Sequence, residues 1–327
     1  MQRREFITLL GGATVAWPLA ARAQQTAIPV IGYLGAESPA AFASRLKAFR
    51  QGLADTGYAE GRNVSIEYRW AQGQHSRLAA LATDLVGRRV SVIVAPGGAP
   101  AALAAKSATT TIPIVFEMGA DPIAIGLVGS LSHPGGNLTG VTSLSVEVTP
   151  KRLEFLHEMI PTAGLIAVLV NPTSPTAASQ SRKLQDTARD RGVQLHFLQA
   201  SNERDFDTVF ATLPELRAAG LVFASDTMFA THSEQLAALT VRHAVPAIHQ
   251  SRDFTTAGGL MSYGGSFVES HRQAGVLTGR ILRGDKPADL PVQQVTKVEL
   301  FINLKTAKAL GITVPQSVQN RADEVIE

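Results

Sequence analysis

The residues of this chain that could do chemistry are small and polar, and no catalytic constellation accompanies them. His232, His243 and His249 lie near Asp226 and Asp253, which is one pattern that could form a His/Asp site. The spacings of 11 and 6 residues between these histidines do not place them on one helix face, so surface or loop histidines are the simpler interpretation. The motifs G-x-S-x-G and H-E-x-x-H, a P-loop, and a G-x-G-x-x-G after the first apolar run are all missing.

Composition narrows the chemistry further. The chain has 327 residues and no cysteine, which excludes disulfides, thiolate metal sites, cysteine nucleophiles and a lipidated cysteine anchor. The formal net charge is only +3, and no run of five or more basic residues occurs, so nucleic-acid binding is not indicated. We therefore predict no metal, no cofactor and no enzymatic reaction.

Six segments rich in small and polar residues follow apolar runs that we interpret as strands. In doubly wound sheets, ligands bind at the carboxyl ends of the strands, where such segments lie. Turn formation alone explains any one of them, but six such segments, all expected to face the cleft between two lobes, favour a ligand site. They are Gly35–Ser38, Pro96–Ala99, Glu117–Asp121, Asn171–Ser174, Ser225–Met228 and Tyr263–Gly265.

Residues of these segments and of the adjoining strands are the candidate site. Gly97 and Gly98 open a helix, so free N–H groups there are suited to an anion. Asp226 is suited to an ammonium group, with a role as a helix N-cap as the alternative. The full set of candidate ligand-binding residues is Tyr33, Glu37, Gly97, Gly98, Ala99, Met118, Asp121, Asn171, Ser174, Asp226, Thr227 and Tyr263.

Apolar runs alternate with helical periodicity twice along the chain, which predicts an α/β fold of parallel sheets covered by helices. In the first helix, Ser38 is the expected N-cap, Pro39 the first residue and Gly57 the terminating residue. The expected strands are Val30–Leu34, Val64–Tyr68, Val90–Ala95, Ile114–Phe116, Leu165–Val170, Val193–Leu198, Leu221–Ala224, Ala247–His249 and Leu260–Tyr263, with more strand in Val292–Leu304.

A loop-forming stretch at 133–140 separates the two series and favours two Rossmann-like, doubly wound lobes over one long open sheet. We expect the first lobe to comprise 28–142 plus about 265–290, and the second 143–264 plus about 291–327. Short side chains and glycines predict hinges at Thr139–Ser143 and Ser262–Gly265.

Residues 1–23 have the pattern of an export signal. Arg3 and Arg4 precede the apolar run Ile7–Ala20, and an A-x-A pattern ends at Ala23, where cleavage is predicted. The run is too short to span a bilayer, so no stable membrane insertion is expected. The arginine pair resembles a twin-arginine signal, and an ordinary secretory signal is the alternative. Either signal predicts a mature protein in the periplasm.

Taken together, several motifs in order resemble the substrate-binding proteins of bacterial ABC transporters, in the branch that includes tryptophan- and tyrosine-binding members. The resemblance runs essentially end to end. The motifs are Ile31–Leu34, Phe49–Leu53, Gly57–Tyr58, Asp121–Ile123, Gly126–Val128, Pro134–Gly140, Gly258–Gly264 and Ile302–Ala307.

This resemblance implies the periplasmic binding protein type I fold, with two lobes joined by three crossovers. It also implies capture of a small solute, an amino acid or related small carboxylate, between the lobes. The partners implied are an ABC permease and its ATPase, with the binding protein acting as a monomer. Two alternatives stay open: a periplasmic sensor that signals to a membrane receptor, and a periplasmic α/β enzyme. A transcription regulator of this fold is disfavoured, because an export signal precedes the first strand and no DNA-binding helices do.

Overall fold

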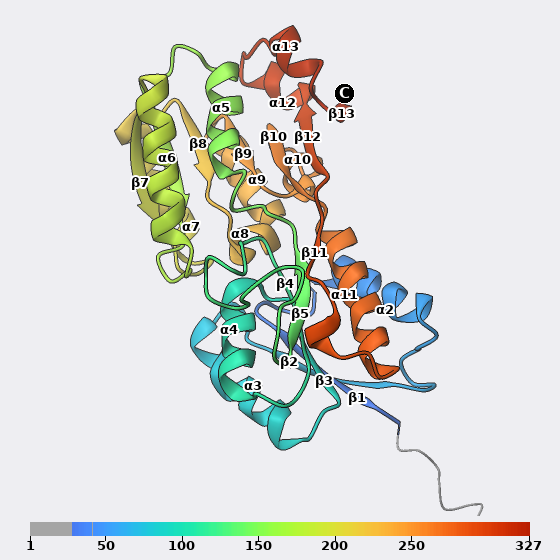
Figure 1. Ribbon diagram of the computed structural model, residues 1–327. Helices are drawn as coiled ribbons and strands as arrows, with labels where there is room; N and C mark the ends of the chain where they lie inside the picture. Colours follow the sequence, from blue (N-terminus) through green and yellow to red (C-terminus); the bar gives the residue numbers. More distant parts are fainter. Residues whose placement is uncertain (1–27, 41) are drawn as a thin grey trace, which may run out of the picture.

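Strands of the chain form two separate sheets, one in each of two lobes (Figure 1). The computed structural model describes residues 28–40 and 42–327, so the predicted signal lies outside the described residues. The first sheet has the order β11-β5-β4-β3-β1-β2, and the second the order β13-β12-β10-β9-β8-β6-β7. The strands are β1 Val30–Gly35, β2 Ser65–Trp70, β3 Val92–Ala95, β4 Ile114–Met118, β5 Leu138–Thr142, β6 Leu165–Val170, β7 Gln194–Gln199, β8 Gly220–Phe223, β9 Ala247–His249, β10 Met261–Gly265, β11 Gln293–Gln294, β12 Val298–Asn303 and β13 Glu324–Ile326.

Helices cover both faces of each sheet, as expected for buried parallel strands. Among the described residues, neighbouring strands pair in parallel except β10 with β12, where Met261 faces Ile302. The helices are α2 Ala43–Asp55, α3 Leu78–Gly87, α4 Gly98–Ala108, α5 Thr149–Met159, α6 Ala177–Arg191, α7 Asp205–Leu216, α8 Thr227–Thr231, α9 Ser233–Arg242, α10 Arg252–Thr256, α11 Phe267–Leu282, α12 Leu304–Ala309 and α13 Gln316–Gln319, with 3-10 turns at His75–Arg77 and Pro287–Asp289.

The chain crosses between the two sheets three times: after β5, after β10 and after β11. The prediction of two doubly wound lobes is therefore confirmed, and the alternative of one long sheet is wrong. Gln293 and Gln294 pair with Val141 and Thr142 of β5, so the third crossing comes after residue 294 rather than near residue 291.

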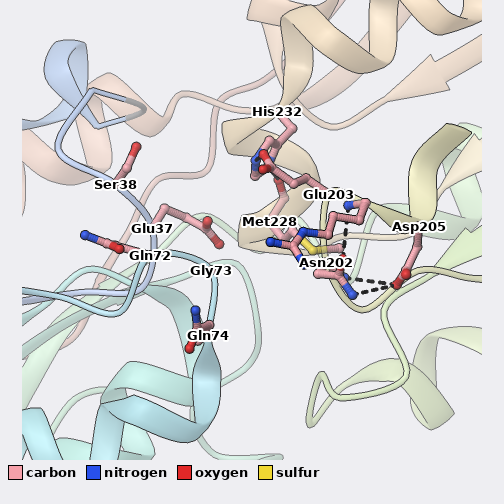
Figure 2. A pocket seen from close by; sticks show the side chains of 11 residues that line it. Glu37, Ser38, Gln72, Gly73, Gln74, Asn202, Glu203, Asp205, Met228 and His232 are labelled. Carbon is pink, nitrogen blue, oxygen red and sulfur yellow. Dashed lines mark hydrogen bonds and ion pairs between the residues drawn. The ribbon is translucent and has the colours of Figure 1, made fainter.

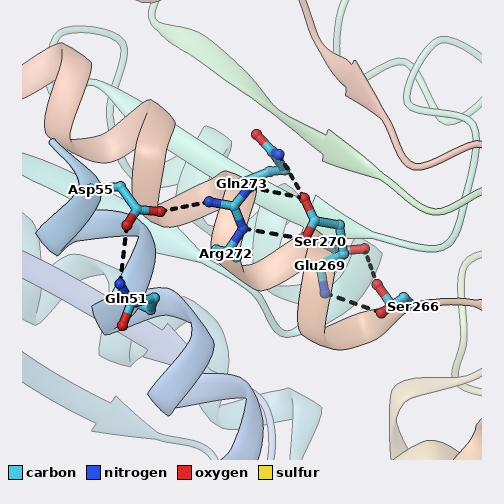
Figure 3. A network of polar contacts seen from close by, with 7 residues as sticks. All are labelled: Gln51, Asp55, Ser266, Glu269, Ser270, Arg272 and Gln273. Carbon is cyan, nitrogen blue, oxygen red and sulfur yellow. Dashed lines mark hydrogen bonds and ion pairs between the residues drawn. The ribbon is translucent and has the colours of Figure 1, made fainter.

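Close packing of α11 on α2 ties the segment after the second crossing to the first lobe. An added Cβ at Gly52 would lie 1.9 Å from the backbone oxygen of Arg272, and one at Gly275 would lie 2.2 Å from that of Phe49. The two helices approach this closely because both contact positions lack a side chain. Arg272 also bonds Asp55 across the helix pair at 2.6 Å (Figure 3).

Two local expectations were wrong. The first helix begins at Ala43, with Phe42 as N-cap, so Ser38 and Pro39 lie outside it. The preceding loop pairs instead with the loop after β2, because the backbone oxygens of Ala36 and Glu37 accept from the N–H groups that follow Ala71. The 133–140 stretch is also not entirely loop, since Leu138–Thr142 form β5 against β4.

The two segments expected to act as hinges lie largely within strands. Thr139–Thr142 lie within β5 and Ser262–Gly265 within β10. The first two connections between the sheets therefore start at Ser143 and Ser266.

Candidate functional site

Segments at the carboxyl ends of strands from both lobes meet across a cleft. Gly97 follows β3 and caps α4, so the helix presents the N–H groups of its first turn toward the cleft. Thr227 follows β8 in the other lobe. A Cβ added to Gly98, whose φ is +74°, would lie 2.5 Å from the Thr227 hydroxyl oxygen. The lobes are therefore in contact here, and only glycine fits both the backbone angle and the space.

A small cavity of about 40 Å³ lies at this contact. Five of the predicted site residues line it together, from three different strand ends: Gly98, Ala99, Ser174, Asp226 and Thr227. The remaining lining residues are Pro100, Gly119, Ala120, Val146, Thr176, Ser225, Gln250 and Phe267.

Asp226 is the N-cap of α8. Its Oδ1 accepts from the backbone N–H of Met228 at 3.0 Å and from the side-chain amide of Asn171 at 3.1 Å. The Gln250 side chain donates to the Asp226 backbone oxygen at 2.5 Å. The residue is 8% exposed and lines the cavity. Since a carboxylate offers about four acceptor sites, capping leaves it able to bind a donor from a ligand.

A larger cavity of about 730 Å³ opens beside the first, also between the lobes (Figure 2). Met228, two residues after Asp226, lines it from the second lobe. The first lobe contributes the loops after β1 and β2, and the second lobe contributes the loop after β7. The lining residues are Glu37, Ser38, Gln72, Gly73, Gln74, Asn202, Glu203, Arg204, Asp205, Met228 and His232.

Glu37 is the buried carboxylate of this larger cavity. It is 2% exposed, and its Oε1 is buried without a hydrogen-bond partner. Desolvation raises the pKa of Glu37 to about 7; His232 lowers this pKa and Asp226 raises it. In Figure 2 its side chain points toward the second lobe.

His232 connects the larger cavity to the second-lobe backbone. Its Nδ1 lies 2.8 Å from the Met228 backbone oxygen, and its Nε2 lies 3.1 Å from Glu203 Oε2. Nδ1–H can donate to this carbonyl in the neutral ring. Nε2 can then donate to Glu203 only if it also carries a proton, that is, in the charged form of the ring.

The three histidines grouped in the sequence do not form one site. His232 packs on Phe206, His243 on Phe210 and His249 on Phe223. Burial lowers the pKa of His249 to about 3, so this ring is neutral. Within 28–40 and 42–327, no three His, Asp or Glu side chains are grouped so as to hold a metal ion.

Four other predicted site residues lie within cores or turns. Tyr33 is buried against Phe49, and Met118 is buried in the first-lobe core. Tyr263 packs on Phe155 in the second lobe. Asp121 shapes a turn, since its Oδ1 accepts from the N–H of residue 123.

Gly97 and Asn171 do not line the small cavity but contact or position residues around it. A Cβ on Gly97 would lie 2.7 Å from that of Ala36, so glycine lets the loops after β1 and β3 pack together. Asn171 is 1% exposed and positions Asp226 through its amide.

Arg152 joins the second lobe to the connections between the lobes. Its guanidinium donates to the backbone oxygens of Ser145 at 2.8 Å and Tyr263 at 2.7 Å, and to the Ser225 hydroxyl at 2.8 Å. The residue is fully buried, and desolvation lowers its pKa to about 9. Ser145 lies in the first crossing and Tyr263 lies in β10 just before the second, so one side chain fixes the first crossing to the second-lobe sheet.

Arg45 makes a contact across the cleft from the first lobe. Its Nη2 donates to the backbone oxygen of Ala230 at 3.4 Å, and the guanidinium lies 4.4 Å from the centre of the Phe267 ring. Burial lowers the pKa of Arg45.

The loops 72–74 and 202–205 were missed by the sequence analysis, although both line the larger cavity. The signal was present, because each is a polar segment directly after a predicted strand. The same edge rule that selected the other six segments would have selected these two.

The fold and the cleft define a two-lobed binding protein, and comparison with known proteins identifies its family. Residues 35–326 match the model of the family described as ABC transporter substrate binding protein. The chain belongs to this family, and it is accordingly the solute-binding component of an ABC transport system.

Three relatives illustrate the similarity. A tyrosine-binding protein of Clostridioides difficile (strain R20291) is 28% identical over 267 residues, covering 81% of this chain and 76% of that protein. A conserved domain protein from Vibrio cholerae is 28% identical with a TM-score of 0.83, covering 91% of this chain and 99% of that one. A Streptococcus pneumoniae ABC domain in complex with L-Trp is 26% identical with a TM-score of 0.80 and the same coverage.

None of the helices in the described part of the chain is long and apolar enough to cross a membrane.

Proposed function

We propose that the protein captures an α-amino acid with an aromatic side chain, of the L-tyrosine or L-tryptophan type, in the cleft between its lobes. The observation that carries this proposal is that the start of α4 and the Asp226 carboxylate line one cavity from opposite lobes. A helix start favours an anion and a carboxylate favours a cation. These are the two charged ends of an amino acid.

The relatives support the aromatic class. One is named for binding tyrosine, and a solved structure that resembles this chain contains L-Trp. Phe267 in the small cavity and Met228 in the larger one supply apolar surface for a ring.

Capture requires the lobes to separate. A cavity of about 40 Å³ is too small for an amino acid, and the lobes are already in contact at Gly98 and Thr227 in its wall. Solute bound to one lobe then gains contacts with the other and shifts the equilibrium toward the closed form. We propose residues 28–142 with 266–294 as the first lobe and 143–265 with 295–327 as the second.

The closed form then delivers its solute to a membrane permease powered by an ATPase, and the chain itself catalyses no reaction. We propose that it acts as a monomer in the periplasm, after cleavage near Ala23 leaves about 300 residues.

Isothermal titration tests the solute class on the protein without residues 1–23. We expect L-tyrosine or L-tryptophan to bind. Indole-3-propionate, which lacks the ammonium group, and tryptamine, which lacks the carboxylate, should each bind about tenfold or more weakly, since each loses a charge-assisted hydrogen bond. Equal affinity for all three indole compounds would refute the proposed role of both charged ends, and no binding of either amino acid would refute the class.

A further inference from the structure

A buried carboxylate with an unpartnered oxygen faces the larger cavity, and the proposed function so far gives it no role. Glu37 is 2% exposed, and its Oε1 has no hydrogen-bond partner. A buried charge that lacks a partner is costly, so such a group is either neutral or awaits a cation. Its position in the cavity wall, aimed toward the second lobe, makes it available to a bound molecule (Figure 2).

The groups around Glu37 leave a surplus of negative charge. Asp226 at the start of α8 and Glu203 in the loop after β7 are both close enough to Glu37 to raise its pKa. His232, which follows α8, and Arg45 of α2 oppose these charges. His232 already lies 3.1 Å from Glu203.

We propose that the ammonium group of the solute binds between Glu37 of the first lobe and Asp226 of the second, and that this binding expels a proton held by Glu37. The solute ammonium keeps its own three protons, and the Glu37 carboxyl proton passes to solvent. This inference rests on the proposed amino-acid function, since it names the partner of that ligand's cationic end.

The arrangement couples charge to closure. Without solute, ionised Glu37 and Asp226 repel one another across the cleft, and protonation of Glu37 relieves the repulsion. A cation between them attracts both carboxylates, and because each belongs to a different lobe, the attraction draws the lobes together. While the lobes are in contact, desolvation and Asp226 raise the pKa of Glu37 to about 7, so Glu37 of the solute-free closed form holds its proton in slightly acidic solution.

The sign of the pH dependence follows from linkage. A proton competes with the solute ammonium group for the Glu37 carboxylate. The affinity for solute should therefore be highest above about pH 7 and should fall as the pH decreases. With a pKa of about 7, lowering the pH from 7.5 to 5.5 should weaken binding by up to about 25-fold. The amino acid keeps its charges throughout this range, so its own titration adds nothing.

Titration calorimetry with L-tryptophan tests the inference. At pH 6, binding should release up to about 0.9 proton, measured as the difference in apparent enthalpy between phosphate and Bis-Tris buffers. Glu37→Gln should abolish both the proton release and most of the 25-fold pH dependence. Glu215→Gln, an exposed carboxyl group of α7 outside the cavity, is the matched control and should retain both.

His232 is a second titratable group in the cavity, and His232→Gln separates it from Glu37. If the pH dependence disappears in His232→Gln and persists in Glu37→Gln, the inference is overturned. A thermal melt of each variant checks folding, and Glu37→Asp, which keeps the carboxyl group, should still release a proton. Binding of L-tryptophan without proton release overturns this inference alone, whereas no binding at any pH overturns the proposed function.

Discussion

Gly98→Ala should act as a wedge between the lobes. The new methyl group would lie 2.5 Å from the Thr227 hydroxyl oxygen, a distance that real Cβ atoms do not show. The clash exists only while the lobes are in contact, so it should favour the open form and weaken solute binding.

Two energies combine in this variant and must be separated. A non-glycine residue at the φ of +74° costs about 1–2 kcal/mol whether the lobes are open or closed. Overpacking costs about a further 1–3 kcal/mol in the closed form alone. The overpacking cost in the closed form corresponds to about a 5- to 150-fold rise in the Kd for solute.

Gly126→Ala is the matched control. Its φ is +69°, and no atom lies within 4 Å of the added Cβ, so it carries the backbone strain without the wedge. Both variants should lose similar unfolding free energy in urea, but only Gly98→Ala should raise the Kd for L-tryptophan. Adding Thr227→Ala to Gly98→Ala should restore affinity. Equal Kd values for the two single variants would refute closure at this contact.

Two further outcomes follow from the structure, and a third follows from the sequence. Asp226→Ala should lower the unfolding free energy by about 2 kcal/mol, through loss of the helix cap and of the Asn171 hydrogen bond. It should also weaken L-tryptophan binding about tenfold or more. A lower urea midpoint with an unchanged Kd would show that Asp226 acts only as a helix cap. Gly52→Ala should destabilise by about 3 kcal/mol because its Cβ would lie 1.9 Å from a backbone oxygen, whereas Gly87→Ala, with nothing within 4 Å, should change stability by less than about 1 kcal/mol; similar urea midpoints would refute the tight helix packing. Replacing Arg3 and Arg4 with lysine should block export of a reporter fused to residues 1–26, and normal export would favour the ordinary secretory route.

The alternating apolar runs predicted most of the fold, because fully buried parallel strands leave a strong signal in sequence. Leu165–Val170 and Ala247–His249 were predicted at their observed bounds. Strand β5 was missed because Pro134 and three glycines mark its surroundings as loop, while its pairing with β4 depends on residues far along the chain. The rule that ligands bind at the carboxyl ends of strands also selected Gly98 and Asp226, and the arrangement of the two lobes brings these ends of two different sheets to one cavity.

Local patterns could not predict what tertiary contacts decide. Ser38 and Pro39 form a good helix start, but the loop that contains them pairs with the loop after β2. Tyr33 and Tyr263 lie near strand ends in sequence, yet their side chains pack into cores. The positions of Glu37 and His232 on two sides of one cavity depend on how the lobes meet.

Small-angle scattering tests the central claim most directly, namely that the lobes close on an amino acid. The radius of gyration of the protein without residues 1–23 should fall when L-tryptophan or L-tyrosine is added at saturation, with binding verified by calorimetry on the same sample. An unchanged radius of gyration at proven saturation would contradict capture by closure of the cleft.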